Sequence, residues 1–191
     1  MAISGAMTES EFIAAIKRNP FNRAILERLP SLALSDAWLV SGALFQTVWN
    51  VQTKRAPAYG IKDYDIFDPD TSWEAEDRTI KRAATVFSNL DISIEVRNQA
   101  RVHLWYEEKF AMPYPPLTKA TGGIDRFLMH NAQVGIQANA NGTEIHAPRR
   151  FDDIFKMIVR PNHTANFHPD RYREKALRWK ELWPELTLLP P

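Results

Sequence analysis

The sequence contains no cysteine among its 191 residues. This absence excludes a disulfide framework, a thiolate zinc site and a cysteine nucleophile, and it is typical of proteins in a reducing compartment. The chain also lacks a recognisable signal peptide and any apolar run near the ~20 residues that a membrane span needs. We therefore expect a cytoplasmic protein that does not enter a membrane.

The sequence also lacks a large excess of positive or negative charge. Lys and Arg number 24 and Asp and Glu number 23, which gives a formal net charge of +1, and no long basic stripe is present. Proteins that bind long nucleic acid concentrate positive charge, so we do not expect such a partner. Without an internal repeat or a low-complexity linker, the chain is predicted to be one domain. We divide it into N-terminal helices (1–34), a core (35–150) and C-terminal helices (151–191).

Local signals predict most of the secondary structure. Thr8 and Glu11 have the spacing of a capping box, and Asn19 before Pro20 is typical of a second helix start. Alternating or helically spaced apolar residues predict strands at 38–40, 63–67, 92–97, 134–138 and 143–146, and helices at 43–51, 71–90, 121–130, 151–158 and from 168 onward. The segment 98–106 fits either a strand or a helix. This order indicates an α/β or α+β core.

Two carboxylates stand out on the strand at 63–67. Asp63 and Asp65 are two residues apart, so on a strand they share one face. Like charges at this distance repel, and a hard divalent cation such as Mg²⁺ relieves the repulsion. Glu95 lies in the middle of the next predicted strand, where a cross-strand neighbour approaches to ~5 Å. The three carboxylates can therefore converge on a metal site.

A strand, a glycine-centred turn, a helix, an Asp-x-Asp strand and a strand with a third acid resemble the DNA polymerase beta-like nucleotidyltransferase superfamily. Within it, the chain looks like a bacterial nucleotidyltransferase-like family of undetermined substrate. The stretches that carry the resemblance are 38–50, 59–67, 72–77 and 95–109. The resemblance implies an α+β nucleotidyltransferase fold, with a mixed β-sheet, flanking helices and a C-terminal helical segment.

The resemblance also implies roles for individual residues. Asp63 and Asp65 would bind Mg²⁺ or Mn²⁺ ions that hold the triphosphate of an NTP, and Glu95 would ligate one ion and help to activate the acceptor hydroxyl. The turn would present backbone N–H groups to the phosphates at a helix N-terminus. Its residues are Ser41, Gly42 and Ala43.

Arg97 and Arg101 suit the binding of a triphosphate, because guanidinium presents a fork of donors. Their alternative role is a surface ion pair with Glu107 or Glu108.

The implied activity is Mg²⁺-dependent transfer of a nucleotidyl group from an NTP to an unidentified hydroxyl acceptor, which is a small molecule, a protein side chain or an RNA end. The alternative is a non-catalytic member of the same fold that binds a nucleotide or a partner protein. The turn favours this alternative, because Gly42 is followed by Ala43 where the superfamily commonly has serine or glycine.

Four aromatic residues follow the third predicted strand, namely Trp105, Tyr106, Phe110 and Tyr114. They have two interpretations. Aromatic rings can stack a nucleotide base, but aromatic residues at this density more often form a core. We favour the core.

Overall fold

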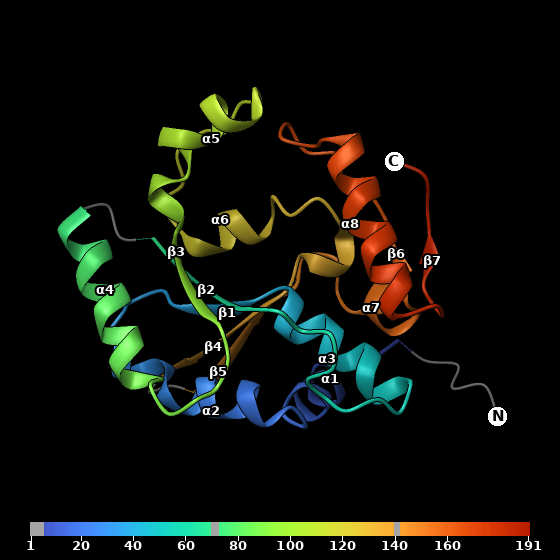
Figure 1. The fold of residues 1–191 in the computed structure, drawn as a ribbon, viewed down its shortest axis with the longest axis horizontal. Helices are drawn as coiled ribbons and strands as arrows, with labels where there is room; N and C mark the ends of the chain where they lie inside the picture. Colours follow the sequence, from blue (N-terminus) through green and yellow to red (C-terminus); the bar gives the residue numbers. More distant parts are fainter. Residues whose placement is uncertain (1–5, 70–72, 140–141) are drawn as a thin grey trace.

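The computed structural model describes residues 6–69, 73–139 and 142–191, and a five-stranded sheet lies at the centre of this part of the chain (Figure 1). Its strands are β1 (Trp38–Val40), β2 (Tyr64–Asp68), β3 (Ile94–Asn98), β4 (Gly135–Asn139) and β5 (Gly142–His146). Their order is β3-β2-β1-β4-β5. Strands β2 and β3 are parallel and the other neighbours are antiparallel, so the predicted mixed sheet of an α+β fold is confirmed.

Helices cover the sheet and extend beyond it. The α-helices are α1 (Glu9–Ile16), α2 (Pro20–Arg28), α3 (Gly42–Gln52), α4 (Trp73–Val86), α5 (His103–Phe110), α6 (Ala120–Ile124), α7 (Asp152–Phe155) and α8 (Pro169–Leu182). Three 3-10 helices are η1 (Leu29–Leu32), η2 (Gln99–Arg101) and η3 (His130–Ala132), and a small parallel pair is formed by β6 (Ile158–Val159) and β7 (Thr187–Leu188). Within the described residues, no helix is both long and apolar enough to cross a membrane.

Polar side chains in the core fix the start of β2. Asn19 caps α2 by accepting from the N–H of Phe21, and its Nδ2 also donates to Tyr64 Oη at 3.1 Å. Asn22 is fully buried and donates to the carbonyl of Ala43 at 2.8 Å. The amide donors of both side chains are satisfied in this way and hold a single geometry. Because Tyr64 is anchored on the core side, its neighbours at 63 and 65 project from the other face of the strand.

A seam of aromatic rings joins α8 to α3. Trp179 meets Phe45 edge to face with ring centroids 5.0 Å apart, and Trp183 meets Trp49 at 5.4 Å. Tyr172 is also buried and donates from its hydroxyl to the carbonyl of Val159 at 2.9 Å. These contacts fix the rotation of α8 about its axis, so that its opposite, polar side is directed away from the core.

The segments at 98–106 and 121–130 depend on long-range contacts. The first is helical, as η2 and the start of α5. The second was predicted as one helix, but α6 ends at Ile124. Asn162 donates to the carbonyls of Asp125 and Phe127, and Gln133 also donates to that of Asp125. These carbonyls would otherwise accept from N–H groups further along a helix, so the side chains replace the helix.

Two other predictions need correction or fall outside the described chain. The helix predicted for 151–158 ends at Phe155, and Ile158 lies in β6 because Met157 has a left-handed φ of 55°. The start of the helix predicted for 71–90, and residues 140–141 between the strands predicted at 134–138 and 143–146, lie outside the described residues.

Candidate functional site

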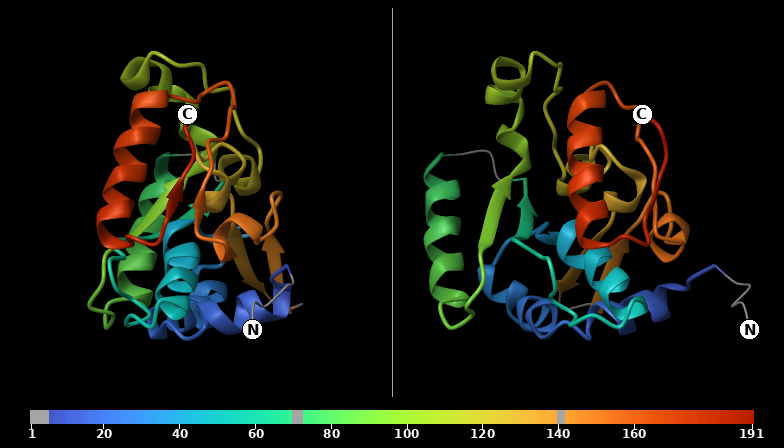
Figure 2. Two further views of the ribbon diagram at one scale, coloured as in Figure 1. Left: turned by 90° about the vertical axis from the view of Figure 1, so that its right-hand side faces the viewer. Right: turned by 45° about the vertical axis from the view of Figure 1, so that its right-hand side comes forward.

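The three predicted carboxylates lie at one end of a cleft of about 360 Å³. The parallel register of β2 and β3 places Asp65 directly opposite Glu95. Asp63 immediately precedes β2 and lines the same cleft. Asp63 is exposed and Asp65 is half-buried. The backbone therefore brings all three positions together on neighbouring strands, with α5 beyond the end of β3 and α8 beside α3 (Figure 1 and Figure 2).

The electrostatics at Asp65 favour a cation. Burial is the largest cause that raises the pKa of Asp65 to about 6, and repulsion from Asp63 and, to a smaller extent, from Glu95 contributes to the same shift. Arg97 and Lys175 act in the opposite direction. Since the cations of the protein do not offset burial and repulsion, these oxygen ligands fit a hard divalent ion such as Mg²⁺.

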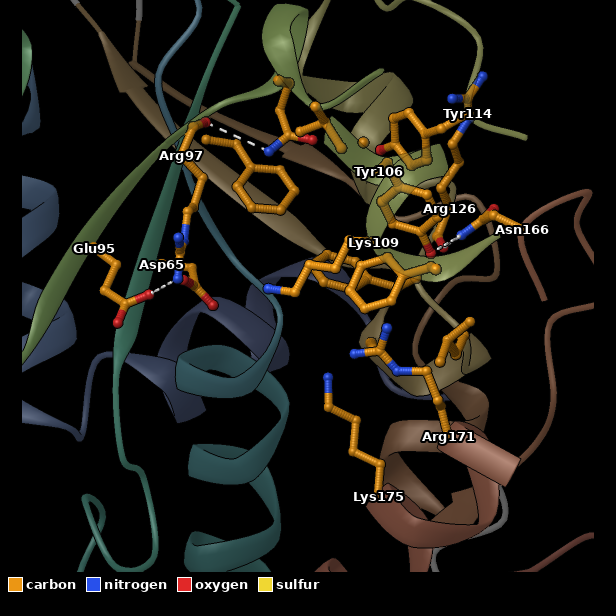
Figure 3. A pocket seen from close by; sticks show the side chains of 18 of the residues that line it. Asp65, Glu95, Arg97, Tyr106, Lys109, Tyr114, Arg126, Asn166, Arg171 and Lys175 are labelled. Atoms are coloured by element: carbon orange, nitrogen blue, oxygen red, sulfur yellow. Dashed lines mark hydrogen bonds and ion pairs between the residues drawn. The ribbon is translucent and has the colours of Figure 1, made fainter. Parts of the chain in front are cut away.

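The side chain of Glu95 does not converge with the aspartates. It forms an ion pair with Arg97, two residues along the same strand, and the guanidinium lies beside Asp65 (Figure 3). In the described parts of the chain, no three His, Asp or Glu side chains are gathered so that they could hold a metal ion. The three-carboxylate metal centre therefore stays a prediction, with its backbone positions adjacent and Glu95 bound to Arg97.

The turn between β1 and α3 contributes one residue to this region. Gly42 lines a small cavity of about 90 Å³ together with Asp63, Lys62 and Arg178. Ser41 is buried, with φ 55° and ψ −116°, and its N–H donates to the carbonyl of Val134 at 2.8 Å.

The remaining predicted binding residues lie elsewhere. Ala43 is part of the hydrophobic core. Arg101 is buried and forms an ion pair with Glu76 of α4 at 3.3 Å, and it is not among the described residues that line the cleft. The partners of the arginines also differ from the expected Glu107 and Glu108, because Arg97 pairs with Glu95 and Arg101 with Glu76.

Helix α8 supplies cations that the sequence prediction missed. Arg171 and Lys175 line the cleft, and Arg178 lines the adjoining small cavity. Loss of hydration at the mouth of the cleft lowers the pKa of Lys175, and repulsion from Arg178 lowers it further, whereas Asp65 and Asp63 raise it. Lys175 thus faces the aspartates. The spacing of these cations, i, i+4 and i+7, places them on one side of a helix and could have revealed them.

The aromatic residues after β3 form a wall of the cleft. The prediction that they form a core is wrong, because α5 contains no buried residue and Trp105 is 43% exposed. Tyr106 contacts Tyr114 with ring centroids 4.5 Å apart and Phe110 at 4.7 Å. Arg126 lies over the ring of Tyr114, 4.3 Å from its centroid. The cleft therefore has carboxylates at one end and aromatic rings with cations at the other (Figure 3).

Comparisons with known proteins agree with this architecture. A solved NMR structure, described as a CCA-adding enzyme head domain, matches with a TM-score of 0.75 at 23% sequence identity, over 96% of this chain and 97% of the other. This likeness shows the fold and not the substrate. No curated protein matches the chain significantly. The model of a nucleotidyltransferase family matches residues 27–188, and the chain therefore belongs to this nucleotidyltransferase family.

Proposed function

We propose that the protein transfers a nucleotidyl group from an NTP to a hydroxyl acceptor, and that Asp63, Asp65 and Glu95 hold the Mg²⁺ on which this transfer depends. The observation that carries the proposal is the register of β2 and β3, which opposes Asp65 to Glu95 at the end of the cleft. Membership of a nucleotidyltransferase family supports it.

A divalent ion at these carboxylates would neutralise phosphate charge and orient the triphosphate for in-line displacement. The protein supplies the rest. Lys175 faces the aspartates from α8 and offers an ammonium group to a phosphate oxygen. Gly42 exposes backbone beside Asp63 at the N-terminus of α3, where a helix favours anions.

Arg97 has one role in the metal-free site and another in the proposed metal-bound site. Its guanidinium neutralises Glu95 in this structure and also lowers the pKa of Asp65. Glu95 is free to ligate a metal ion once this ion pair opens. The side chain of Arg97 is 57% exposed, so opening it costs little. The released guanidinium would then be available to the triphosphate.

The same ion pair favours the alternative function, a non-catalytic nucleotide- or protein-binding member of the fold. In such a protein, Arg97 would neutralise Glu95 permanently and no metal would be needed. The two functions differ in one measurable property, which is the dependence of nucleotide binding on the metal.

Calorimetric titration with α,β-methylene-ATP tests the proposal, with Mn²⁺ or with EDTA. We expect EDTA and the substitution Asp65→Asn each to weaken binding by about tenfold or more, since each removes the charge that couples triphosphate to protein. Asp77→Asn is the matched control, because Asp77 is exposed on α4 and pairs with Lys81 at the surface. It should leave the affinity unchanged.

Equal binding with Mn²⁺ and with EDTA, and by wild type and Asp65→Asn, would refute the catalytic proposal and support the alternative. A transfer assay with α-³²P-labelled NTPs completes the test. Label should reach an acceptor only with the metal and with an intact Asp65.

A further inference from the structure

The end of the cleft opposite the carboxylates has its own composition. We call it the distal chamber and define it by Tyr106, Phe110, Tyr114, Arg126, Asn166 and Arg171. Among the described residues that line the cleft, the acidic ones are Asp63, Asp65 and Glu95. Asp65 and Glu95 lie at the other end (Figure 3), and Asp63 precedes Asp65 by two residues. The distal chamber is therefore cationic and aromatic.

Its two guanidinium groups are held in place by rings. Arg171 lies over the ring of Phe110, 3.9 Å from its centroid, and Arg126 lies over Tyr114 at 4.3 Å. Contact with a ring face uses the flat side of guanidinium and leaves the N–H groups at its edge available for an oxyanion.

Neither guanidinium is neutralised by a carboxylate. Arg126 donates from Nη1 to the carbonyl of Pro115 at 2.8 Å, and within the described parts of the chain neither Arg126 nor Arg171 forms an ion pair. Arg126 also bonds the hydroxyl of Tyr114, and the donors of Arg171 together with the remaining donors of Arg126 are open to a ligand with negative charge.

Other residues keep the chamber in shape. Asn166 is buried and donates from Nδ2 to the carbonyl of Arg126 at 3.1 Å. The same group reaches the hydroxyl of Tyr106 at 3.4 Å. These bonds tie the loop before α8 to the segment that carries Arg126 and to α5. The chamber is consequently ordered before a ligand arrives, which reduces the entropy cost of binding.

We propose that the distal chamber binds a phosphate group of the acceptor, so that the acceptor is a phosphorylated hydroxyl compound rather than a neutral one. The proposal rests on the function proposed above. A neutral hydroxyl compound would leave the two arginines without an anionic partner. The rings of Tyr106 and Tyr114 further favour an acceptor with a planar ring, such as a nucleotide.

The donor has its own cations at the carboxylate end. Lys175 and Arg97 are the principal positive charges acting on Asp65, and Arg178 lines the cavity next to Gly42. A triphosphate held there by the carboxylates and these cations would leave Arg126 and Arg171 for a second anion. This division of charge is the reason to assign the distal chamber to the acceptor.

The test measures binding of 5′-AMP and of adenosine to the protein with Mn²⁺ and saturating α,β-methylene-ATP, by calorimetry. We expect 5′-AMP to bind at least about tenfold more tightly than adenosine, because charge-assisted hydrogen bonds to phosphate are worth that much. Arg126→Gln and Arg171→Gln should each remove most of this preference. Arg171 is exposed, so its variant keeps the test valid if loss of the Arg126 bond to Pro115 disturbs folding.

Arg173→Gln is the matched control, since Arg173 lies on the same helix but pairs with Asp170 at the surface. It should retain the preference. Equal affinity for 5′-AMP and adenosine would refute the proposal. Weaker α,β-methylene-ATP binding in Arg126→Gln and Arg171→Gln without 5′-AMP would also refute it, because the chamber would then belong to the donor.

The result for the distal chamber can be distinguished from the result for the proposed nucleotidyl transfer, which the substitution Asp65→Asn tests. A preference for 5′-AMP that persists where nucleotide binding is independent of metal would overturn the acceptor assignment, since phosphate would then bind without a transferable donor.

Discussion

The seam between α3 and α8 and the wall formed by α5 are built from similar residues but have opposite roles. In the seam, Trp49 and Trp183 are fully buried, and their indole N–H groups donate to the carbonyl of Ile154 at 3.0 Å and to Asn50 Oδ1 at 2.7 Å. In the wall, Trp105 is 43% exposed and α5 contains no buried residue. An aromatic cluster therefore stabilises the fold only where both its apolar surface and its polar atoms are satisfied.

Replacing one tryptophan by alanine in each region should give the largest difference in stability between the seam and the wall. We expect Trp49→Ala to lower the free energy of unfolding by about 3–5 kcal/mol, because it leaves a large cavity and an unpaired carbonyl. Trp105→Ala is the matched control and should cost less than about 0.5 kcal/mol, as is usual for surface positions. Urea unfolding followed by circular dichroism measures both.

A decrease of more than about 2 kcal/mol in the free energy of unfolding of Trp105→Ala would contradict the distinction between seam and wall, because a decrease of that size is typical of a core residue. The α5 wall would then be part of the core and unsuited to bind a ligand.

The features of this molecule that depend on residues close in sequence could be predicted from the sequence. The capping box of Thr8 and Glu11, and the turn between β1 and α3, follow from short-range spacing, and the structure confirms them. The opposition of Asp65 and Glu95 also follows, because two adjacent strands of alternating pattern were recognisable.

What the sequence did not reveal depends on tertiary contacts. The aromatic density at α5 resembles that of the seam, and only the packing of the chain decides which cluster is covered. Glu95 and Arg97 are neighbours on one face of β3. Whether the carboxylate of Glu95 binds Arg97 or turns toward a metal ion depends on its side-chain rotamer, which the sequence does not specify. The position of Lys175 opposite Asp65 follows from the burial of Tyr172 in the core, over 100 residues away from β2.

The carboxylate end of the cleft should also differ from the seam in its response to pH. The pKa of Asp65 is about 6 in the folded protein, against an ordinary value of 3.8. Folding therefore takes up a proton between these values, and the free energy of unfolding should rise as the pH falls from 7 to 5. In EDTA, we expect the free energy of unfolding of wild type to rise by about 1–2 kcal/mol over this interval relative to that of Asp65→Asn. This value allows for the partial exposure of Asp65.

Urea unfolding of both proteins at pH 5 and pH 7 measures this difference. Asp77→Asn should follow the wild-type curve, because Asp77 is exposed and its substitution leaves Asp65 unchanged. Parallel pH curves for wild type and Asp65→Asn would show that burial and repulsion do not act on Asp65.

The smallest effect is expected at Ser41, which lies between β1 and the first residue of α3. Its φ of 55° and ψ of −116° are unfavourable for a residue with a Cβ atom, and glycine adopts them without a steric clash. We expect Ser41→Gly to raise the free energy of unfolding by about 0.5–1 kcal/mol, because relief of strain exceeds the added entropy of the unfolded chain. Ser41→Ala keeps the strain, so its stability should match that of wild type.

The same pair of variants tests whether the serine hydroxyl binds phosphate. Ser41 is buried and is not among the described residues that line either cavity, whereas Gly42 lines the cavity beside Asp63. Both variants should therefore bind α,β-methylene-ATP with Mn²⁺ as tightly as wild type. A shared loss of about tenfold would assign a phosphate contact to the hydroxyl, since that is the effect of one charge-assisted hydrogen bond. A loss in Ser41→Gly alone would instead show that the strained turn itself orders the backbone donors for the triphosphate.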